Sequence, residues 1–340
     1  MNLKTRNNRH FLFAALIAAV AIFASGPGIM RAAALAAGLD VEIPFEIKPL
    51  KSSVVAPYFL AVDNGNLIVS DQAGGLYTVT MGGKATPIAP KTKLKNPAGV
   101  AIAPAGFGSA GDYYVLNATD IKGPCEVDKV SKSGDVSSFA KLPAGASGCR
   151  DLEFGAGGTP FAGKLYAATT GNATIYAIDS SGKATPFGTY DKPVAFELTT
   201  IGFAPASDPK APNMMLIGMR PKMAGGAKVG RIGVAGPDGK LKDDPYLVGF
   251  TRPSGFGYSP ASFGTYDTVF FIVDTGKLIS ENNGERDGAV YRLEKGLARP
   301  YASGLMDPTD MKFVGGKMVI ADPAEKGKGQ GSLVIISSMM

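Results

Sequence analysis

The sequence predicts an all-β protein, a six-bladed β-propeller built from four-stranded antiparallel blades. Three observations lead to this prediction. A unit of a strand, a Gly/Pro turn and a β-rich strand recurs about every fifty residues, which is typical of repeat folds. Glycine and proline are abundant, with 45 Gly and 24 Pro among 340 residues, and they follow no collagen-like period. The hydrophobic content of 45% is enough for a large core.

The N-terminal segment has the features of a signal peptide. Residues 1–10 are basic, residues 11–23 form an unbroken apolar run, and Ala34-Leu35-Ala36 offers the small residues that signal peptidases recognise. We therefore expect residues 1–36 to be a signal peptide and residues 37–340 a single propeller domain, periplasmic or secreted and not membrane-bound after cleavage. An uncleaved anchor is the alternative, although Arg31 interrupts the apolar segment before it reaches spanning length.

Two compositional facts restrict the chemistry of the exported chain. Its two cysteines, Cys125 and Cys149, are most simply paired as a disulfide in an oxidising compartment, with two free thiols as the alternative. The one histidine, His10, lies in the leader. Catalytic triads with histidine, a histidine general base and His-ligated zinc or copper are therefore excluded.

The net charge of +6 does not indicate nucleic-acid binding. Lys4, Arg6, Arg9 and Arg31 all precede the first acidic residue, and without them 31 basic residues face 29 acidic ones. A protein that binds nucleic acid needs a concentrated basic surface, whereas the remaining basic residues are scattered among acids. We expect no nucleic-acid partner and a monomer.

The repeat units follow one another along the chain. Residues 96–108 and 112–117 recur as 252–264 and 268–274, and shorter copies lie at 149–155 with 164–169 and at 308–313 with 317–322. Degenerate copies begin near Tyr58 and Thr199. A third strand and a fourth strand follow in most units, as in residues 174–179 and 184–188. Six such units predict six blades, and a pair of β-sandwiches is the competing architecture.

The last unit ends after three strands, at residues 331–337. Residues 41–47, directly after the leader, read as a strand without a partner in its own surroundings. We therefore expect this N-terminal strand to close the last blade as its outer member, which would join the two ends of the chain and limit exposed sheet edges.

Alignment of the repeats places polar residues at one face of the disc. The start of strand one and the end of strand two lie at the same height in an antiparallel blade. The aligned strand starts are Phe59, Gly99, Asp151, Thr200, Gly255 and Asp310, and the aligned strand ends are Asp71, Asn117, Thr169, Met219, Asp274 and Asp322. Five carboxylates and an asparagine are therefore expected at a common channel mouth.

Carboxylates gathered in this way repel one another unless a cation neutralises them. Calcium is the first candidate, followed by magnesium or manganese, with Asn117, Asp71, Asp274 and Asp322 as ligands. Asp at a strand end also commonly accepts hydrogen bonds from backbone amides in a neighbouring turn, so a purely structural role is the alternative.

Other residues map to the same face. Arg150, Arg220 and Arg252 would hold a carboxylate or phosphate of a ligand through paired hydrogen bonds, or remain solvated loop charges. Cys125 and Cys149 map there as well. Glu153 lies in the middle of a strand, where we expect it to pair with Arg150 or with a lysine of a neighbouring blade.

At the level of single blades the repeats resemble the NHL and gluconolactonase-like six-bladed propellers, on residues 304–313, 318–322 and 95–102. The resemblance implies a divalent metal at the channel mouth that polarises a lactone carbonyl, with Asn117 and Asp274 most like the ligands and Asp151 and Asp310 as additions. The first-blade Glu-Gly-Pro of those enzymes is missing, and Phe59 stands at the corresponding position. Mechanisms of related propellers that use histidine do not transfer to this chain.

Two functions follow from these patterns. The first is a propeller that binds a divalent cation and a small polar or anionic ligand, as a metal-dependent lactone or ester hydrolase in which Asp151 or Asp310 is the catalytic general base. The second is a non-catalytic propeller that binds a protein or a glycan with the same face.

Overall fold

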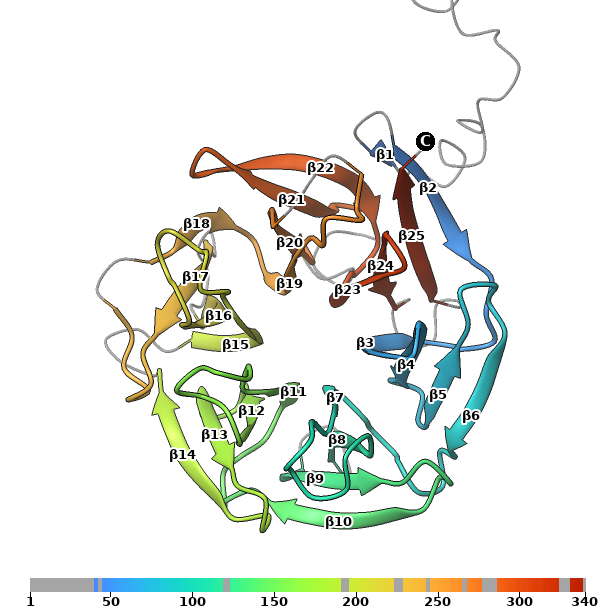
Figure 1. The fold of residues 1–340 in the computed structure, drawn as a ribbon, viewed down its shortest axis with the longest axis vertical. Helices are drawn as coiled ribbons and strands as arrows, with labels where there is room; N and C mark the ends of the chain where they lie inside the picture. Colours follow the sequence, from blue (N-terminus) through green and yellow to red (C-terminus); the bar gives the residue numbers. More distant parts are fainter. Residues whose placement is uncertain are drawn as a thin grey trace, which may run out of the picture.

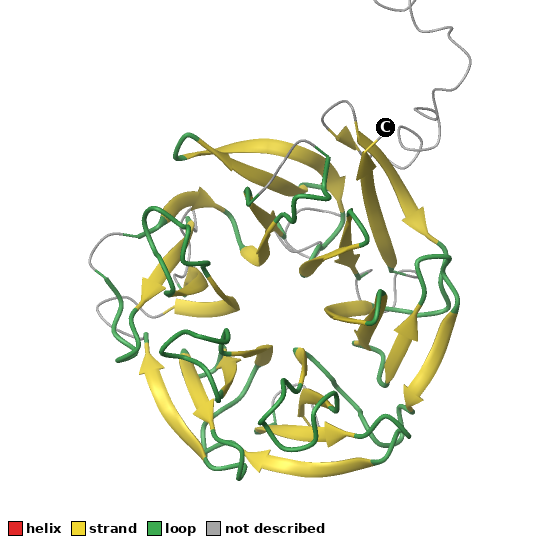
Figure 2. Cartoon of the chain, viewed as in Figure 1, coloured by secondary structure: helices red, strands yellow, loops and turns green. Residues whose placement is uncertain are grey.

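The computed structural model describes residues 40–41, 45–118, 123–190, 196–222, 229–242, 245–264, 268–276, 286–323 and 331–338. Every regular element in these ranges is a β-strand (Figure 2). The strands form six antiparallel sheets around a central axis, so the predicted six-bladed propeller is confirmed (Figure 1). Within the same ranges, no helix has the length and hydropathy needed to cross a membrane. The expected signal peptide, residues 1–36, lies outside the described residues.

The first three blades each contain four strands that are consecutive in the chain, with the first strand innermost (Figure 1). Blade 1 consists of β3 (Pro57–Asp63), β4 (Asn66–Asp71), β5 (Leu76–Val79) and β6 (Ala85–Ala89). Blade 2 consists of β7 (Val100–Ile102), β8 (Tyr113–Ala118), β9 (Cys125–Val130) and β10 (Val136–Lys141). Blade 3 consists of β11 (Cys149–Phe154), β12 (Leu165–Thr169), β13 (Thr174–Ile178) and β14 (Ala184–Thr189).

The remaining blades include both N-terminal strands. Blade 4 consists of β15 (Phe196–Phe203), β16 (Met215–Pro221), β17 (Gly230–Ala235) and β18 (Leu247–Phe250). Blade 5 consists of β19 (Pro253–Tyr258), β20 (Phe270–Asp274), β21 (Gly288–Glu294), β22 (Leu297–Leu305) and β1 (Asp40–Val41). Blade 6 consists of β23 (Asp310–Val314), β24 (Lys317–Asp322), β25 (Ser332–Ser338) and β2 (Phe45–Leu50).

The N-terminal strand closes the last blade as expected. Strand β2 pairs with β25 over six residue pairs, with Ile47 opposite Ile336. One feature differs from the prediction, because the chain pairs with blade 5 before it reaches blade 6. Asp40 and Val41 lie opposite Ser303 and Ala302 of β22 and make blade 5 five-stranded. The N-terminal segment thus joins the outer edges of two consecutive blades.

Local sequence explains the tightest turn of blade 1. Asn64 and Gly65 connect β3 to β4, and their φ angles are 49° and 77°. Two-residue hairpins favour turns with positive φ at both central residues, and Asn-Gly is the pair that adopts them most readily. The flanking Asp63 and Asn66 are paired across the hairpin.

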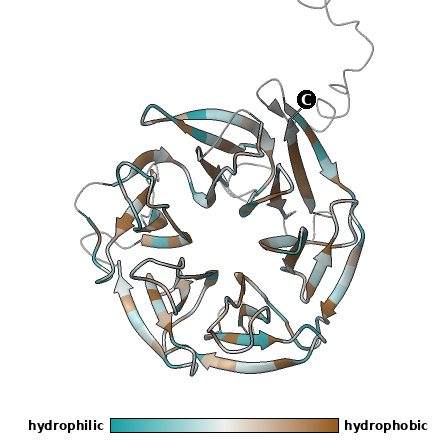
Figure 3. Ribbon diagram, viewed as in Figure 1, coloured by the Kyte–Doolittle hydropathy of each residue, from teal (hydrophilic) through white to brown (hydrophobic). Residues whose placement is uncertain are grey.

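The core lies between the blades rather than within one of them. Alternating residues of a strand face opposite neighbours, so in β4 the side chain of Ile68 packs in the cluster shared with blade 2, whereas Leu67 and Val69 pack in the cluster shared with blade 6. Hydrophobic residues accordingly recur along the strands of the blades (Figure 3). This packing holds the inner strands close together around the channel and positions the residues at its mouth.

Candidate functional site at the channel mouth

The predicted alignment of strand starts and strand ends is present in the structure. Pro57 pairs with Asp71, Cys149 with Thr169 and Pro253 with Asp274. These pairs lie at one face of the disc. Cys149 and residues next to the other pairs line a cavity of about 310 Å³ at this face, whereas Asp71, Thr169 and Asp274 themselves do not line it. We call this cavity the channel mouth. Its wall includes Tyr58, Phe59, Asn96, Arg150, Thr170, Thr199, Arg252, Ser254, Thr275, Asp307 and Thr309.

The aspartates at the strand ends accept hydrogen bonds from backbone amides. The carboxylate of Asp71 accepts from the amides of Val55, Ala56 and Ala73 at 2.8–3.1 Å. Two of these amides belong to the loop that leads into the first strand of the same blade. Asp71 therefore ties the end of its second strand to that loop.

The same bonding recurs in blades 5 and 6. Asp274 accepts from the amides of Thr251, Arg252 and Gly276 at 2.5–3.2 Å. Asp322 accepts from the amides of Met306 and Asp307 at 2.7–3.1 Å. Burial raises the pKa of Asp274, and it raises the pKa of Asp322 to about 6, although the amides act in the opposite direction.

In blade 2 the equivalent position is Asn117, and it also has partners within the protein. Its side-chain oxygen accepts from the amide of Asn96 at 3.2 Å, and its side-chain nitrogen donates to Asp128 at 2.9 Å. Burial raises the pKa of Asp128 to about 6. This buried amide–carboxyl pair joins neighbouring strands of one blade.

These contacts favour the structural interpretation of the strand-end residues. Metal binding by Asn117, Asp71, Asp274 and Asp322 stays a prediction. Within the described ranges, however, no group of three or more His, Cys, Asp or Glu side chains is arranged to hold a metal ion. These carboxylates do not converge on one point because each one turns toward the amides of its own loop, which keeps the negative charges apart.

Asp151 and Asp310, expected as general bases, join neighbouring blades. Asp151 accepts from the hydroxyl of Thr200 at 2.8 Å and the amide of Ile201 at 2.9 Å, both in blade 4. Asp310 accepts from the amide of Leu60 in blade 1 at 2.9 Å. Both carboxylates are buried, with 4% and 3% exposure. Their contacts are those of inter-blade links, and a catalytic role for either one stays a prediction.

The glycines at the aligned positions make room for these links. A Cβ atom on Gly99 would lie 2.8 Å from the Cα of Asp151, and one on Gly255 would lie 2.7 Å from the Cα of Asp310. Contacts this close do not occur for real Cβ atoms, so the inner strands approach each other only because these positions are glycine. The arrangement in blades 2 to 4 is therefore repeated in blades 5, 6 and 1.

An ion pair crosses the channel below the mouth. Glu153 of β11 accepts from Lys312 of β23 at 2.8 Å, and the lysine also lies 3.7 Å from Asp310. Blades 3 and 6 are on opposite sides of the ring (Figure 1). We expected Glu153 to pair with Arg150 or with a lysine of a neighbouring blade. Its partner is a lysine, but this lysine belongs to the blade on the opposite side of the channel.

The charge balance in the channel shifts the pKa of each partner. Burial raises the pKa of Glu153, and burial together with the charge of Asp151 raises the pKa of Asp310 to about 7. Burial by itself would lower the pKa of Lys312, but the surrounding carboxylates outweigh it and raise that pKa. The carboxylates of Asp151, Glu153 and Asp310 therefore favour the charged form of Lys312.

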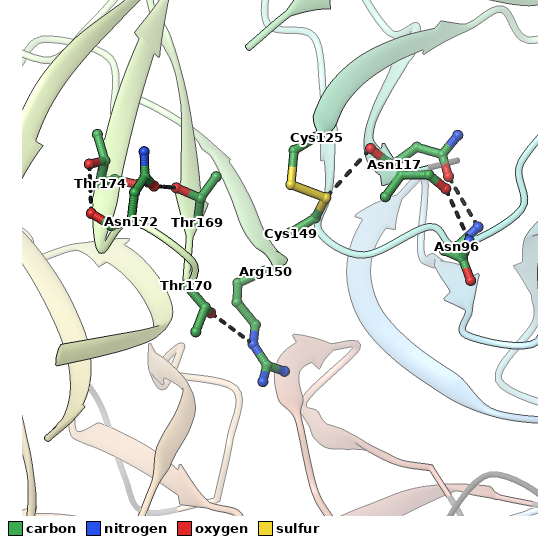
Figure 4. Close-up of a disulfide and its surroundings, with 10 residues drawn as sticks. Asn96, Asn117, Cys125, Cys149, Arg150, Thr169, Thr170, Asn172 and Thr174 are labelled. Carbon is green, nitrogen blue, oxygen red and sulfur yellow. Dashed lines mark hydrogen bonds between the residues drawn. A yellow bond between two sulfur atoms is a disulfide. The ribbon is translucent and has the colours of Figure 1, made fainter. Parts of the chain in front are cut away.

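Two of the three predicted arginines line the channel mouth. Arg150 donates through Nε to the hydroxyl of Thr170 at 3.3 Å (Figure 4). It also donates through Nη1 to the hydroxyl of Tyr58 in blade 1. Arg252 is only 5% exposed and lies 3.9 Å from Glu197.

The guanidinium groups influence one another. Burial and the charge of Arg150 together lower the pKa of Arg252 to about 10, with a smaller contribution from Arg220. Glu197 opposes these effects. The three arginines therefore form one positively charged cluster beside the cavity, although Arg220 is not part of the cavity wall.

The disulfide between Cys125 and Cys149 is confirmed, and it connects blade 2 to blade 3 at the mouth (Figure 4). Its Cα atoms are 5.6 Å apart. Cys149 lines the cavity and directly precedes Arg150, so the cross-link restrains the backbone that carries this arginine.

Sequence reasoning missed Lys312, Glu197 and the hydroxyl groups of the mouth. Lys312 follows an aligned aspartate by two residues, but its partner is 159 residues away in the chain. The hydroxyl residues had a visible signal, since Pro253-Ser254 and Pro308-Thr309 occupy equivalent positions in two repeats.

Comparison with known proteins identifies the fold but not a family. No protein-family model matches the chain, and no curated protein matches it. Among solved structures, a protein of unknown function from Bacteroides thetaiotaomicron matches with a TM-score of 0.59 at 10% identity, over 86% of this chain and 76% of that one.

Two further structures match over similar lengths. A glucose dehydrogenase has a TM-score of 0.58 at 12% identity, over 85% of this chain and 98% of that one. Virginiamycin B lyase from Staphylococcus aureus has a TM-score of 0.53 at 12% identity, over 87% of this chain and 99% of that one. The expected resemblance to such propellers is thus confirmed, and at these identities it extends to the fold alone.

Proposed function

We propose that this protein is an exported, non-catalytic propeller that binds a small anionic ligand at its channel mouth. The observation that carries the proposal is the arginine cluster beside a cavity of about 310 Å³. This volume lies at the lower end of the range typical of small-molecule sites. A guanidinium group binds carboxylate or phosphate oxygens through paired hydrogen bonds.

The charges around the mouth support an anionic ligand. Arg150, Arg220 and Arg252 contribute three positive charges, whereas the acidic side chains beside them are those of Glu197 and Asp307. The three guanidinium groups repel one another, and this repulsion contributes to the lowered pKa of Arg252. An anion between the guanidinium groups relieves this repulsion, and binding is favourable for that reason.

The hydrolase alternative receives less support from the contacts. A general base must reach the proton that it removes. Asp151 and Asp310 instead accept amide and hydroxyl hydrogen bonds between blades, and they are buried. Calcium-dependent hydrolysis therefore remains a hypothesis from the sequence, and binding without catalysis is the function we propose.

Export is part of the proposal because of the disulfide. Cys125 and Cys149 are bonded to each other, and disulfides persist mainly in oxidising compartments such as the periplasm. The basic and apolar leader, residues 1–36, supports the same location.

The proposal is tested by calorimetric titration and thermal unfolding of the purified protein with inorganic phosphate, succinate and neutral succinamide. We expect the two anions to bind and to raise the melting temperature, because a ligand that binds only the folded state stabilises it. Succinamide is expected to have no effect.

A pair of arginine variants provides the specific control. Arg150→Gln should weaken anion binding by about tenfold, which corresponds to the loss of a charged hydrogen bond of about 1.4 kcal/mol. Arg299→Gln changes an exposed arginine of the outer strand β22 and should leave binding unchanged. Equal anion affinity in both variants would rule out the arginine cluster as the site.

A further inference from the structure

The serine and threonine hydroxyl groups of the channel mouth share one hydrogen-bonding state. Each donates its proton to a backbone carbonyl of the next blade or of an adjacent loop. Ser254 and Thr275 both donate to the carbonyl of Pro308, at 2.7 Å and 2.8 Å. Thr199 donates to the carbonyl of Pro253, and Thr309 donates to that of Tyr58.

A carbonyl oxygen only accepts hydrogen bonds, so the proton in each of these bonds belongs to the hydroxyl group. The hydroxyl oxygen then has only its lone pairs left to offer. Thr170 is an example within the protein, because its hydroxyl donates to the carbonyl of Leu198 at 3.0 Å and accepts from Nε of Arg150 at 3.3 Å. The other serine and threonine hydroxyl groups can therefore only accept hydrogen bonds from a ligand in the mouth.

These acceptors form an arc on one side of the cavity. Thr199, Ser254 and Thr309 occupy equivalent positions, because each directly precedes the aligned residue of the first strand in blades 4, 5 and 6. Thr275 follows the second strand of blade 5 and lines the same cavity. All four are at most 7% exposed. Asp307, a further acceptor, also lines this part of the wall. Arg150 projects from blade 3, outside the arc, and offers donors.

We infer that the ligand is a hydroxylated organic anion, whose acidic group binds the guanidinium groups and whose hydroxyl groups donate to the acceptor arc. This inference rests on the proposed function and narrows its ligand. A ligand with an apolar chain would displace water from the buried acceptors and leave them without donors, which is costly. A ligand ammonium group would satisfy the acceptors, but the arginine cluster repels it.

Hydroxylated carboxylates and phosphate esters of polyols share this chemistry, and two matched pairs of probes distinguish them. L-tartrate and succinate have the same chain length and are both dianions at mildly alkaline pH, but only tartrate carries hydroxyl groups. Glycerol phosphate and propyl phosphate form the corresponding phosphate pair. Calorimetric titration of the unmodified protein measures all four affinities.

We expect the hydroxylated member of at least one pair to bind at least about fivefold more tightly than its partner. This difference corresponds to one or more hydrogen bonds of about 1 kcal/mol. The pair with the higher affinity identifies the acidic group. Ser254→Ala and Thr275→Ala should remove this preference without weakening succinate or propyl phosphate. Thr86→Ala, on the exposed outer strand β6, is the matched control and should have no effect.

The outcomes separate this inference from the proposed function. If both members of each pair bind equally well, the acceptor arc does not select the ligand, and anion binding at the mouth still stands. If none of the four probes binds, both the inference and the proposed function are overturned. The comparison of probes on the unmodified protein holds even where a variant fails to fold.

Discussion

Removal of the lysine in the channel is expected to destabilise the fold strongly. In the variant Lys312→Met, the carboxylates of Glu153, Asp310 and Asp151 lose the cation that they share. At the observed distance of 2.8 Å and an effective dielectric constant of about 20, the attraction between Lys312 and Glu153 is about 6 kcal/mol. Desolvation of the pair offsets part of this attraction.

The measured loss should therefore be smaller than the Coulomb energy. The side chains of Lys312 and Glu153 retain 24% and 28% exposure in the channel, so water screens them in part. Removing one partner of a largely buried pair costs about 3 to 5 kcal/mol, and we expect about 3 kcal/mol at neutral pH. The loss should shrink as the pH falls, because protonation of the remaining carboxylates removes the uncompensated charge.

Urea unfolding at equilibrium, with free energies extrapolated to zero denaturant, measures this effect. The double variant Lys312→Met/Glu153→Gln should recover part of the stability, since one of the buried charges is neutral in it. Lys240→Met is the control, because Lys240 lies 4.0 Å from Asp238 with 84% side-chain exposure, and it should change the free energy of unfolding by less than about 0.5 kcal/mol. If Lys312→Met costs no more than the control, the channel pair does not hold blades 3 and 6 together.

Three further predictions concern the aspartates and the disulfide. Burial raises the pKa of Asp310 to about 7 in the folded state, above its ordinary value of 3.8. The folded protein therefore gains stability as the pH falls through about 7, and the gain ends near pH 3.8. Asp310→Asn should flatten this rise in the free energy of unfolding, measured with urea between about pH 8 and pH 5, and an unchanged slope would contradict the prediction. Reduction of the Cys125–Cys149 disulfide should cost about 3 kcal/mol, measured as lower stability in urea with a reductant, and equal stability would show that the cross-link contributes nothing. Asp71→Ala should cost about 2 kcal/mol because three amides lose their acceptor, whereas Asp71→Asn should retain most of that stability in thermal melts; a calcium-induced rise in melting temperature that Asp71→Asn abolishes would instead indicate a metal ligand.

Much of the fold was predictable because its information is local. The fifty-residue period, the alternation of strands and Gly/Pro turns, and the Asn64-Gly65 hairpin each act over a few residues of chain. The closing strand was predictable because the last repeat lacks an outer member. The pairing of Asp40–Val41 with blade 5 was not, since two residues at a sheet edge carry no periodic signal.

The candidate site also has a part that the repeats predicted and a part that they did not. The repeats predicted that Arg150 and Arg252 would share the mouth with Cys149, because equivalent positions in each blade lie at the same height. They did not predict what each aspartate would bind. An Asp at the end of a strand has the same sequence signal whether it accepts amide hydrogen bonds or coordinates a cation, and the direction of the side chain decides between them.

By itself, the sequence determined the number of blades, the order of the four repeat strands within each blade and the face on which the polar residues gather, because hydrophobic alternation and turn chemistry act within a blade. Only the tertiary structure decided that Lys312 reaches Glu153 across the channel, that Asp151 and Asp310 join neighbouring blades, and that the mouth hydroxyls donate to carbonyls of other segments. The physical reason is that these contacts depend on how the blades are arranged around the axis. The closed ring sets this arrangement through packing between blades, and no single repeat contains it.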